Sequence, residues 1–202
     1  RANICPTREF LARGRQELQV KSCRHCLAEN ESCPHIIGYC PVVQDMRIKR
    51  HNQLCESLAN EAKKKDWIIF NEPLLKSDQN ELDKPDLIFV KDNQALVVDM
   101  IIRYETPPAT SLVDAANEKV KKCEHLKIQI QELTNCENIK FYGFPIGARG
   151  KWHQGNYELL TELGLSSSRR EKVARQMSNR ALFTSLDIMH IFMSKSRSVM
   201  RS

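Results

Sequence analysis

The sequence predicts an α/β fold in which helices cover both faces of a central mixed sheet, with a small metal-binding segment preceding it. Short apolar runs typical of strands alternate with longer segments of helical periodicity. Residues 87–90 and 95–98 are apolar at every position, so both faces of their sheet are expected to be buried. The metal-binding segment is indicated by four of the eight cysteines, which fall within residues 23–40.

The composition narrows the class of protein. The chain has 202 residues, enough for one domain with an appendage. No apolar run approaches the roughly 18 residues of a membrane span, so no membrane partner is expected. The N-terminus has neither a Met nor the apolar core of a signal peptide. We therefore expect a fragment of a longer protein from a reducing compartment, in which clustered cysteines bind metal.

The charge is unevenly distributed along the chain. Residues 149–202 hold ten Lys and Arg against four Asp and Glu, a surplus equal to the formal net charge of +6 of the whole chain. A basic C-terminal third indicates an anionic partner, with nucleic acid the first candidate. A solvated helical face explains the same charge equally well.

Residues 23–42 are predicted to form a CCHC zinc knuckle between a basic linker, 1–22, and a larger domain, 43–202. Two thiolates separated by two residues can bind one ion, and an imidazole and a thiolate separated by four can complete a tetrahedral Zn²⁺ shell. Four protein ligands leave no open position, so this zinc would be structural. His25 and Cys33 are spare ligand types in the same stretch, and the alternative is a set of unrelated free thiols. The predicted ligands are Cys23, Cys26, His35 and Cys40.

The segment 84–99 reads as a β-hairpin. A two-residue turn at Asp92-Asn93 suits both residues, because both tolerate positive φ. Counting back from that turn places Asp86 directly opposite Asp99, and like charges facing each other across a strand pair are destabilising. A divalent cation held by the two carboxylates resolves the conflict. The alternative is that Asp86 belongs to a strand-entry turn and Asp99 is a solvated strand end.

The remaining elements follow from periodicity and from Gly and Pro positions. Before the hairpin, the sequence predicts a helix over 43–65, a short buried strand over 67–73 and a polar loop over 74–83. After the hairpin, the sequence predicts a helix over 111–132, a strand over 139–146 and a basic loop with two glycines over 147–152. A short helix ending at Leu163 follows. The last element is a long helix or helix pair that begins at a Ser168-x-x-Glu171 capping box. The inward stripe of the 111–132 helix is assigned to Val113, Ala116, Val120, Cys123 and Ile130. Lys119 and Lys122 share a face beside that stripe.

An acidic pair on a hairpin flanked by helices resembles the core of the PD-(D/E)xK nucleases, which have the restriction-endonuclease-like fold. Over nearly the whole chain, an ordered series of motifs is similar to the C-terminal region of site-specific non-LTR retrotransposon proteins that insert into ribosomal RNA genes. In that family a CCHC zinc knuckle precedes a restriction-like endonuclease, and a reverse transcriptase lies upstream. The motifs are Cys-Arg-x-Cys, His-Ile-Ile-Gly-Tyr-Cys-Pro, Arg50-His51, Glu72-Pro73, Lys84-Pro85-Asp86, Val98-Asp99, Lys119-Val120 and Gly143-Phe-Pro-Ile-Gly-Ala-Arg-Gly-Lys-Trp152.

The resemblance implies that Asp86 and Asp99 bind catalytic Mg²⁺, for which Mn²⁺ can substitute. Lys119, with Lys122 as the alternate, would activate the attacking water or neutralise the phosphate. In the nuclease pattern a lysine lies two residues after the second acid, and here Ile101 occupies that place. The implied product is a nick in double-stranded target DNA whose 3′-hydroxyl primes reverse transcription of the element RNA. Ribosomal DNA is the implied target, and the nucleus, including the nucleolus, is the implied location.

Other assignments remain open at this stage. Glu72 is either a further metal ligand or a structural strand end, and Arg149 either contacts DNA or caps the sheet edge. A catalytically inactive, zinc-stabilised nucleic-acid-binding module is the main alternative function, and a free-standing restriction or repair nuclease is a third. The residues expected to contact DNA phosphates are Arg50, His51, Arg149, Lys151, Arg169, Arg170 and Arg175.

Overall fold

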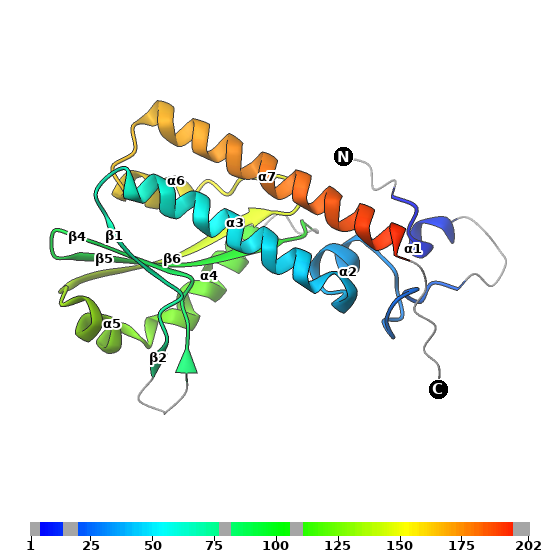
Figure 1. Ribbon diagram of the computed structural model, residues 1–202, viewed down its shortest axis with the longest axis horizontal. Coiled ribbons are helices and arrows are strands. Elements are labelled where there is room, and N and C mark those ends of the chain that lie inside the picture. The colour runs from blue at the N-terminus through cyan, green and yellow to red at the C-terminus, as the bar shows by residue number, and fades with distance from the viewer. Residues whose placement is uncertain (1–4, 14–19, 77–81, 106–110, 196–202) are drawn as a thin grey trace. The chain divides into compact units, whose positions relative to one another are not determined.

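The computed structural model describes residues 5–13, 20–76, 82–105 and 111–195, so the predicted linker 1–22 lies partly outside the described residues. The chain divides into two compact units, Arg1–Arg50 with Phe183–Ser202, and His51–Leu182. The boundaries expected at residues 22 and 42 stay predictions. The elements are α1 Arg8–Leu11, α2 Cys33–Gly38, the 3₁₀ turn η1 Pro41–Val43, α3 Gln44–Lys63, β1 Ile68–Asn71, β2 Leu75–Lys76, β3 Leu82–Asp83, β4 Leu87–Lys91, β5 Gln94–Arg103, α4 Ser111–Glu124, α5 Lys127–Thr134, β6 Asn138–Gly147, α6 Asn156–Glu162 and α7 Ser167–Ser194 (Figure 1).

The unit His51–Leu182 is built on a four-stranded mixed sheet with the order β1-β4-β5-β6. β1 and β5 each pair with β4 in the antiparallel direction, and β6 runs parallel to β5. The α/β class and the mixed sheet flanked by helices are therefore as predicted.

The hairpin has the predicted turn and register. Asp92 and Asn93 have φ values of 47° and 61°, as a two-residue turn with positive φ at both positions requires. Leu87 pairs with Val98 in the ladder. One further step along this register places Asp86 opposite Asp99.

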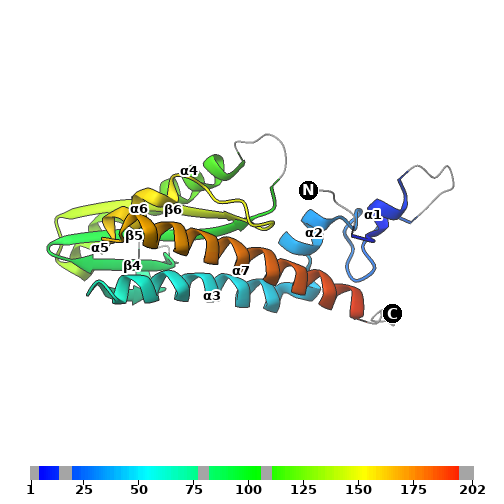
Figure 2. The same cartoon turned by 90° about the horizontal axis from the view of Figure 1, so that it is seen from above.

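Helices cover both faces of the sheet, as the apolar strands predicted (Figures 1 and 2). α3, α6 and α7 cover one face, and α4 and α5 cover the other. Within this unit α3 and α7 run side by side (Figure 2), and the guanidinium of Arg180 donates to the Ser57 hydroxyl at 2.6 Å. The strand residues buried under α3, α6 and α7 are Leu87, Phe89, Leu96, Val98, Met100, Phe144 and Ile146. Those buried under α4 and α5 are Ile88, Ala95 and Val97.

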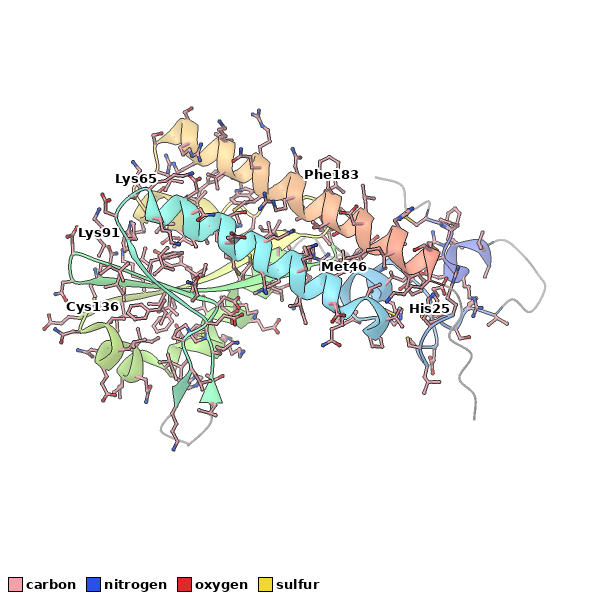
Figure 3. All side chains as sticks on the ribbon, viewed as in Figure 1. His25, Met46, Lys65, Lys91, Cys136 and Phe183 are labelled. Atoms are coloured by element: carbon pink, nitrogen blue, oxygen red, sulfur yellow. The ribbon has the colours of Figure 1, made fainter. Side chains whose placement is uncertain are left out.

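The segments flanking the hairpin differ from the prediction in two places. β1 is an edge strand and not a buried one, with Ile68 63% exposed. Beside Ile68, at the end of β4, the Lys91 ammonium donates to the Lys65 carbonyl at 2.7 Å (Figure 3). The expected polar loop 74–83 contains a small two-stranded sheet of β2 and β3, with residues 77–81 outside the described ranges.

The predicted helix 111–132 is two helices, because the chain turns between α4 and α5 and thereby buries Leu126. The predicted inward stripe was wrong in part: Cys123 and Ile130 are buried as predicted, but the first turn of α4 is not oriented as expected. Val113 is 46% exposed, whereas Leu112 and Ala115 are buried. The inward face of α4 is therefore rotated, and Lys119 lies at an i+4 step from Ala115 on that face.

The C-terminal region is one continuous helix, α7, and its cap is Ser166 and not the predicted Ser168. The Ser166 hydroxyl accepts from the backbone amide of Arg169 at 3.4 Å. Among the described residues, none of the helices combines the length and apolarity that a membrane crossing requires.

Candidate functional site

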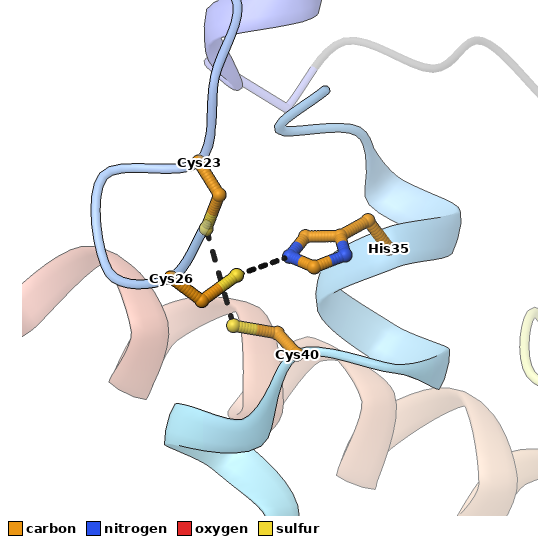
Figure 4. Close-up of side chains that lie close together, drawn as sticks. All are labelled: Cys23, Cys26, His35 and Cys40. Atoms are coloured by element: carbon orange, nitrogen blue, oxygen red, sulfur yellow. Dashed lines mark hydrogen bonds between the residues drawn. The ribbon is translucent and has the colours of Figure 1, made fainter. Parts of the chain in front are cut away.

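Four side chains near the N-terminus form a cluster that could hold a zinc ion, and they are the four predicted (Figure 4). Their ligand atoms all lie within 4.8 Å of one another. Cys23 Sγ lies 4.0 Å from Cys40 Sγ, and Cys26 Sγ lies 3.3 Å from His35 Nε2. Two thiolates bound tetrahedrally to Zn²⁺ at about 2.3 Å would lie about 3.8 Å apart, so the donor set fits the ion.

The second half of this cluster is positioned by the short helix α2. The Ser32 hydroxyl caps the helix by accepting from the His35 amide at 3.2 Å, and Pro34 in the first turn favours the same start. The Cys40 amide donates back to the His35 carbonyl at 2.8 Å. This hydrogen bond turns the chain after α2 and brings Cys40 close to His35.

The first half is held by Glu31, which is fully buried. Its carboxylate accepts from the Arg24 guanidinium at 2.6 Å and from the backbone amides of Arg8 and Arg24 at 3.0 and 2.9 Å. Burial alone would raise the pKa of Glu31, but these hydrogen bonds outweigh it and lower the pKa. Glu31 therefore ties the Cys23–Cys26 loop to the N-terminal segment.

The two spare ligand types lie outside the cluster. His25 Nε2 lies 3.1 Å from the Phe192 carbonyl, and the His25 ring meets the Phe192 ring edge-on. Cys33 is buried, and burial followed by the neighbouring Cys5 raises the pKa of its thiol to about 12. Burial likewise raises the pKa of Cys40 to about 12, so this thiol stays protonated until a cation replaces the proton.

The second candidate site lies on the hairpin. Asp86 precedes β4, and its Oδ2 accepts from the backbone amide of Met100 at 2.7 Å. His51 Nε2, from α3, lies 3.1 Å from the same oxygen. The DNA contact expected of His51 stays a prediction, and the structure adds that its imidazole lies beside this acidic cluster.

Asp99 faces the opposite layer of helices. The Lys119 ammonium of α4 donates to Asp99 Oδ1 at 2.8 Å, and the Cys123 thiol lies 3.7 Å from Oδ2. Asp99 is 4% exposed, so this ion pair is largely shielded from water. Of the two candidate lysines, the structure brings Lys119 to the acids, whereas Lys122 is exposed.

The two carboxyls influence each other. Burial and the hydrogen bond with Asp86 raise the pKa of Asp99, and the Lys119 ammonium opposes them. Burial also acts to raise the pKa of Asp86, but hydrogen bonds from His51 and Asp99 outweigh it and lower the pKa. Hydrogen bonding to Asp86, and then to Cys55, raises the pKa of His51 to about 11. The two carboxyls therefore titrate as a coupled pair, and a cation between them would relieve their mutual repulsion.

A glycine allows α4 to approach closely enough for Lys119 to reach Asp99. Gly143 of β6 pairs with Asp99 of β5 in the parallel ladder. A Cβ on Gly143 would lie 2.1 Å from the Ala116 carbonyl oxygen, a distance that no real contact shows. The backbone of α4 therefore lies directly on the sheet beside the acid, one turn before Lys119.

Gly143→Ala is expected to lower the free energy of unfolding by about 2 kcal/mol, because α4 must move off the sheet to accommodate the methyl group. Chemical denaturation measures this change. Gly38→Ala is the matched control, since an added Cβ there meets nothing within 4 Å, and its expected effect is within about 0.5 kcal/mol. Equal effects at the two glycines would contradict the close approach.

Several residues predicted to bind DNA are engaged within the protein. Arg50 is 3% exposed and donates to the Ser185 hydroxyl at 2.8 Å and the Ile37 carbonyl at 3.2 Å. Its charge is buried, so we do not retain it as a DNA contact. Arg169 pairs with the buried Glu61.

The other predicted basic residues are more accessible. Arg170 is half-buried and donates to the Thr161 hydroxyl. The side chains of Lys151 and Arg175 are exposed.

The basic loop 147–152 is folded around a buried carboxylate, Glu105. Glu105 accepts from the backbone amides of Arg149 and Lys151, and Arg149 Nε lies 3.2 Å from its Oε2. The Arg149 guanidinium also stacks over Tyr104, with 4.8 Å between its carbon and the ring centroid. This geometry matches the structural alternative for Arg149.

Sequence reasoning missed two further features. Cys55 lies one helical turn after His51, and an i, i+4 His-Cys pair is a signal that could have found it. An open pocket of about 310 Å³ lies beside Asp86, and Cys55, Asn71 and Glu72 line it. Glu72 itself pairs with Lys84 at 2.6 Å.

Comparison with known proteins gives a consistent set of relatives, although no protein-family model matches the chain. The chain is 27% identical over 175 residues to a retrovirus-related Pol polyprotein from the type-1 retrotransposable element R2 of Popillia japonica, which covers 86% of this chain and 35% of that protein. It is 27% identical over 170 residues to the Pol polyprotein of the type-2 element R2DM of Drosophila melanogaster, covering 83% and 16%. The corresponding R2 protein of Nasonia vitripennis is 28% identical over 172 residues, covering 82% and 16%.

The chain spans about a third or less of the length of these curated relatives. It is homologous to part of the Pol polyproteins of R2 non-LTR retrotransposons at about 27% identity.

Proposed function

We propose that this chain is the zinc-knuckle and restriction-like endonuclease region of a retrotransposon Pol protein. In this proposal it is a Mg²⁺-dependent endodeoxyribonuclease of the PD-(D/E)xK type that nicks the target DNA. The observation that carries the proposal is the convergence of Asp86, just before β4, Asp99 of β5 and Lys119 of the covering helix α4.

Asp86 and Asp99 would hold the metal, with Mn²⁺ able to substitute. Carboxylate oxygens are the ligands that Mg²⁺ prefers, and a cation between the two acids would relieve their mutual repulsion. When bound, Mg²⁺ supplies Lewis-acid stabilisation of the charge on the scissile phosphate. His51 and the Met100 amide fix one oxygen of Asp86. Lys119 supplies a positive charge beside Asp99, where it would lower the pKa of the attacking water or neutralise the phosphate.

The rest of the proposal concerns the whole Pol protein. The similarity to R2 Pol polyproteins supports a nick whose 3′-hydroxyl primes reverse transcription of the element RNA by a reverse transcriptase upstream of this region. The proposal includes target DNA in the ribosomal RNA genes, as the family resemblance implies, and with it a location in the nucleus and nucleolus. The zinc knuckle would have a structural role, since its four ligands close the coordination shell.

DNA would be bound through phosphate contacts. Lys151 and Arg175 present exposed side chains for such contacts, and Arg169 and Arg170 are half-exposed. Phosphate contacts fix the position of a duplex and make its binding dependent on salt, without reading the sequence.

Lys119→Met is expected to reduce the nicking of supercoiled plasmid in Mg²⁺ by a factor of about 10² to 10⁴, because a charge at the reacting phosphate is lost. Lys122→Met is the matched control, since Lys122 lies on the same helix but is exposed, and its rate should stay within about twofold of the wild type. Gel quantification of the nicked circle over time measures both rates. Equal losses in the two variants, or no loss in either, would remove Lys119 from the proposed mechanism.

The second candidate is a zinc-stabilised nucleic-acid-binding module without catalytic activity. The position two residues after Asp99, where the nuclease pattern has a lysine, is occupied by the half-buried Ile101. Unimpaired DNA affinity with no cleavage in any divalent cation would decide for this candidate.

A further inference from the structure

We propose that His51, Cys55 and Asp86 form a second metal site, selective for zinc-class cations such as Zn²⁺ and Co²⁺. It lies on the α3 side of Asp86, whereas Asp99 lies on the α4 side. The site is distinct from the zinc knuckle, and all three ligands belong to the unit His51–Leu182.

The geometry of the three ligands supports this assignment. His51 and Cys55 lie four residues apart on α3 and therefore project from the same face of the helix. Cys55 Sγ lies 3.8 Å from His51 Nδ1 and 4.0 Å from Nε2, and Nε2 lies 3.1 Å from Asp86 Oδ2. One ligand atom from each residue lies within 4.8 Å of the other two.

The ligand types determine which cation would bind. Thiolate is a soft ligand and imidazole a borderline one, so the set favours Zn²⁺ and Co²⁺ over Mg²⁺. Three protein ligands leave one position of a tetrahedral ion open. The pocket of about 310 Å³ that Cys55 and Asp86 line gives water access to this position.

Neighbouring groups already orient the ligands as a metal site requires. His51 Nδ1 lies 3.4 Å from the Asn52 side-chain oxygen. With Nδ1 directed at Asn52, Nε2 donates its proton to the Asp86 carboxylate, and a bound cation would replace that proton. The Met100 amide fixes the Asp86 oxygen at 2.7 Å. Hydrogen bonds of this kind commonly position the imidazole and carboxylate ligands of metal sites.

The consequence for catalysis rests on the proposed function, because Asp86 would be shared with the catalytic Mg²⁺. A zinc-class ion bound by His51 and Cys55 would engage the Asp86 carboxylate from the α3 side. Occupancy of this site would therefore compete with Mg²⁺ for a shared ligand.

The test is a titration with Co²⁺ of the full chain, whose zinc knuckle has first been loaded with Zn²⁺. We expect one further equivalent of cobalt to bind, with the near-ultraviolet charge-transfer band of a cobalt–thiolate bond. Cys55→Ser and Cys55→Ala should both lose the band, and His51→Asn should lower the cobalt affinity at least about tenfold. Two Cys55 variants are used because the thiol packs against the core, and thermal unfolding shows which of them is folded.

Two matched controls belong to the same unit. Cys136→Ser removes a buried thiol elsewhere, and His125→Asn removes an imidazole that lies 3.0 Å from Asp83. Both should keep the band. Absence of the band in the wild type, or a band of equal strength in a folded Cys55 variant, would overturn the inference.

Nicking assays on the same samples separate this inference from the proposed function. Cobalt binding through Cys55 without any Mg²⁺-dependent nicking would leave the second metal site standing and reject the nuclease. Mg²⁺-dependent nicking without cobalt binding through Cys55 would support the nuclease and reject the second metal site.

Discussion

Asp86→Asn and Asp99→Asn are each expected to lower the rate of Mg²⁺-dependent plasmid nicking by a factor of at least about 10³, on the order of 4 kcal/mol of transition-state stabilisation. Each substitution removes one of the two carboxylates proposed to hold the metal while preserving the shape of the side chain. Time courses of nicked-circle formation measure the loss, and filter binding of labelled duplex measures DNA affinity, which should survive. Asp83→Asn is the matched control, because Asp83 precedes the same hairpin but pairs with His125.

The stability of these variants separates a functional role from a structural one. The raised pKa of Asp99 means that folding costs its charged form more than its neutral form, so a neutral isostere of the same shape does not carry this cost. The free energy of unfolding of Asp99→Asn should therefore fall by no more than about 1 kcal/mol, although its activity is lost. Retained nicking in either variant, or an unfolded Asp99→Asn protein, would contradict the assignment.

Under the proposed zinc site, Cys40→Ser is expected to abolish tight zinc binding and to unfold the knuckle. Structural zinc contributes about 10 to 16 kcal/mol in small zinc domains, more than a short segment with one six-residue helix can supply by packing. Zinc content after dialysis against a chelator measures the first effect. Hydrogen exchange of the amides in residues 23–40 measures the second, and it should approach the rate of an unfolded chain.

Cys33→Ser is the control for this experiment. Cys33 is buried in the same stretch but lies outside the ligand cluster, so its variant should retain the zinc. Retained zinc in Cys40→Ser, or zinc loss in Cys33→Ser alone, would show that the ligand set is different.

The features that could be predicted from the sequence are those fixed by short-range geometry. A two-residue turn at Asp92-Asn93 determines the strand register, because the pairing of every later residue follows by counting. That register placed Asp86 and Asp99 opposite each other. The Cys/His cluster could be predicted because metal coordination restricts the spacing of ligand residues.

The features that could not be predicted depend on packing between elements. Part of the inward face of α4 was misplaced because the exposed Val113 is apolar, whereas the close approach at Gly143 turns Ala115 and Lys119 toward the sheet. The choice between Lys119 and Lys122 depended on that rotation.

The basic residues raised a second difficulty, because charge alone does not reveal a side chain's partner. Arg50 is buried against Ser185, 135 residues away in the sequence. Glu105 and Glu61 likewise engage arginines that the sequence suggested for DNA. No local pattern encodes such long-range partners.

The ion pair between Lys119 and Asp99 has a consequence for the order of binding. Two carboxylates, Asp86 and Asp99, face two side-chain cations, Lys119 and His51, so the group without metal is formally neutral. A bare Mg²⁺ would add two positive charges that no neighbour in this group balances. A phosphodiester arriving with the ion offsets one of them, so metal and DNA should reinforce each other's binding. Under the proposed function, the chain would then hold Mg²⁺ firmly only while a phosphodiester lies in the site.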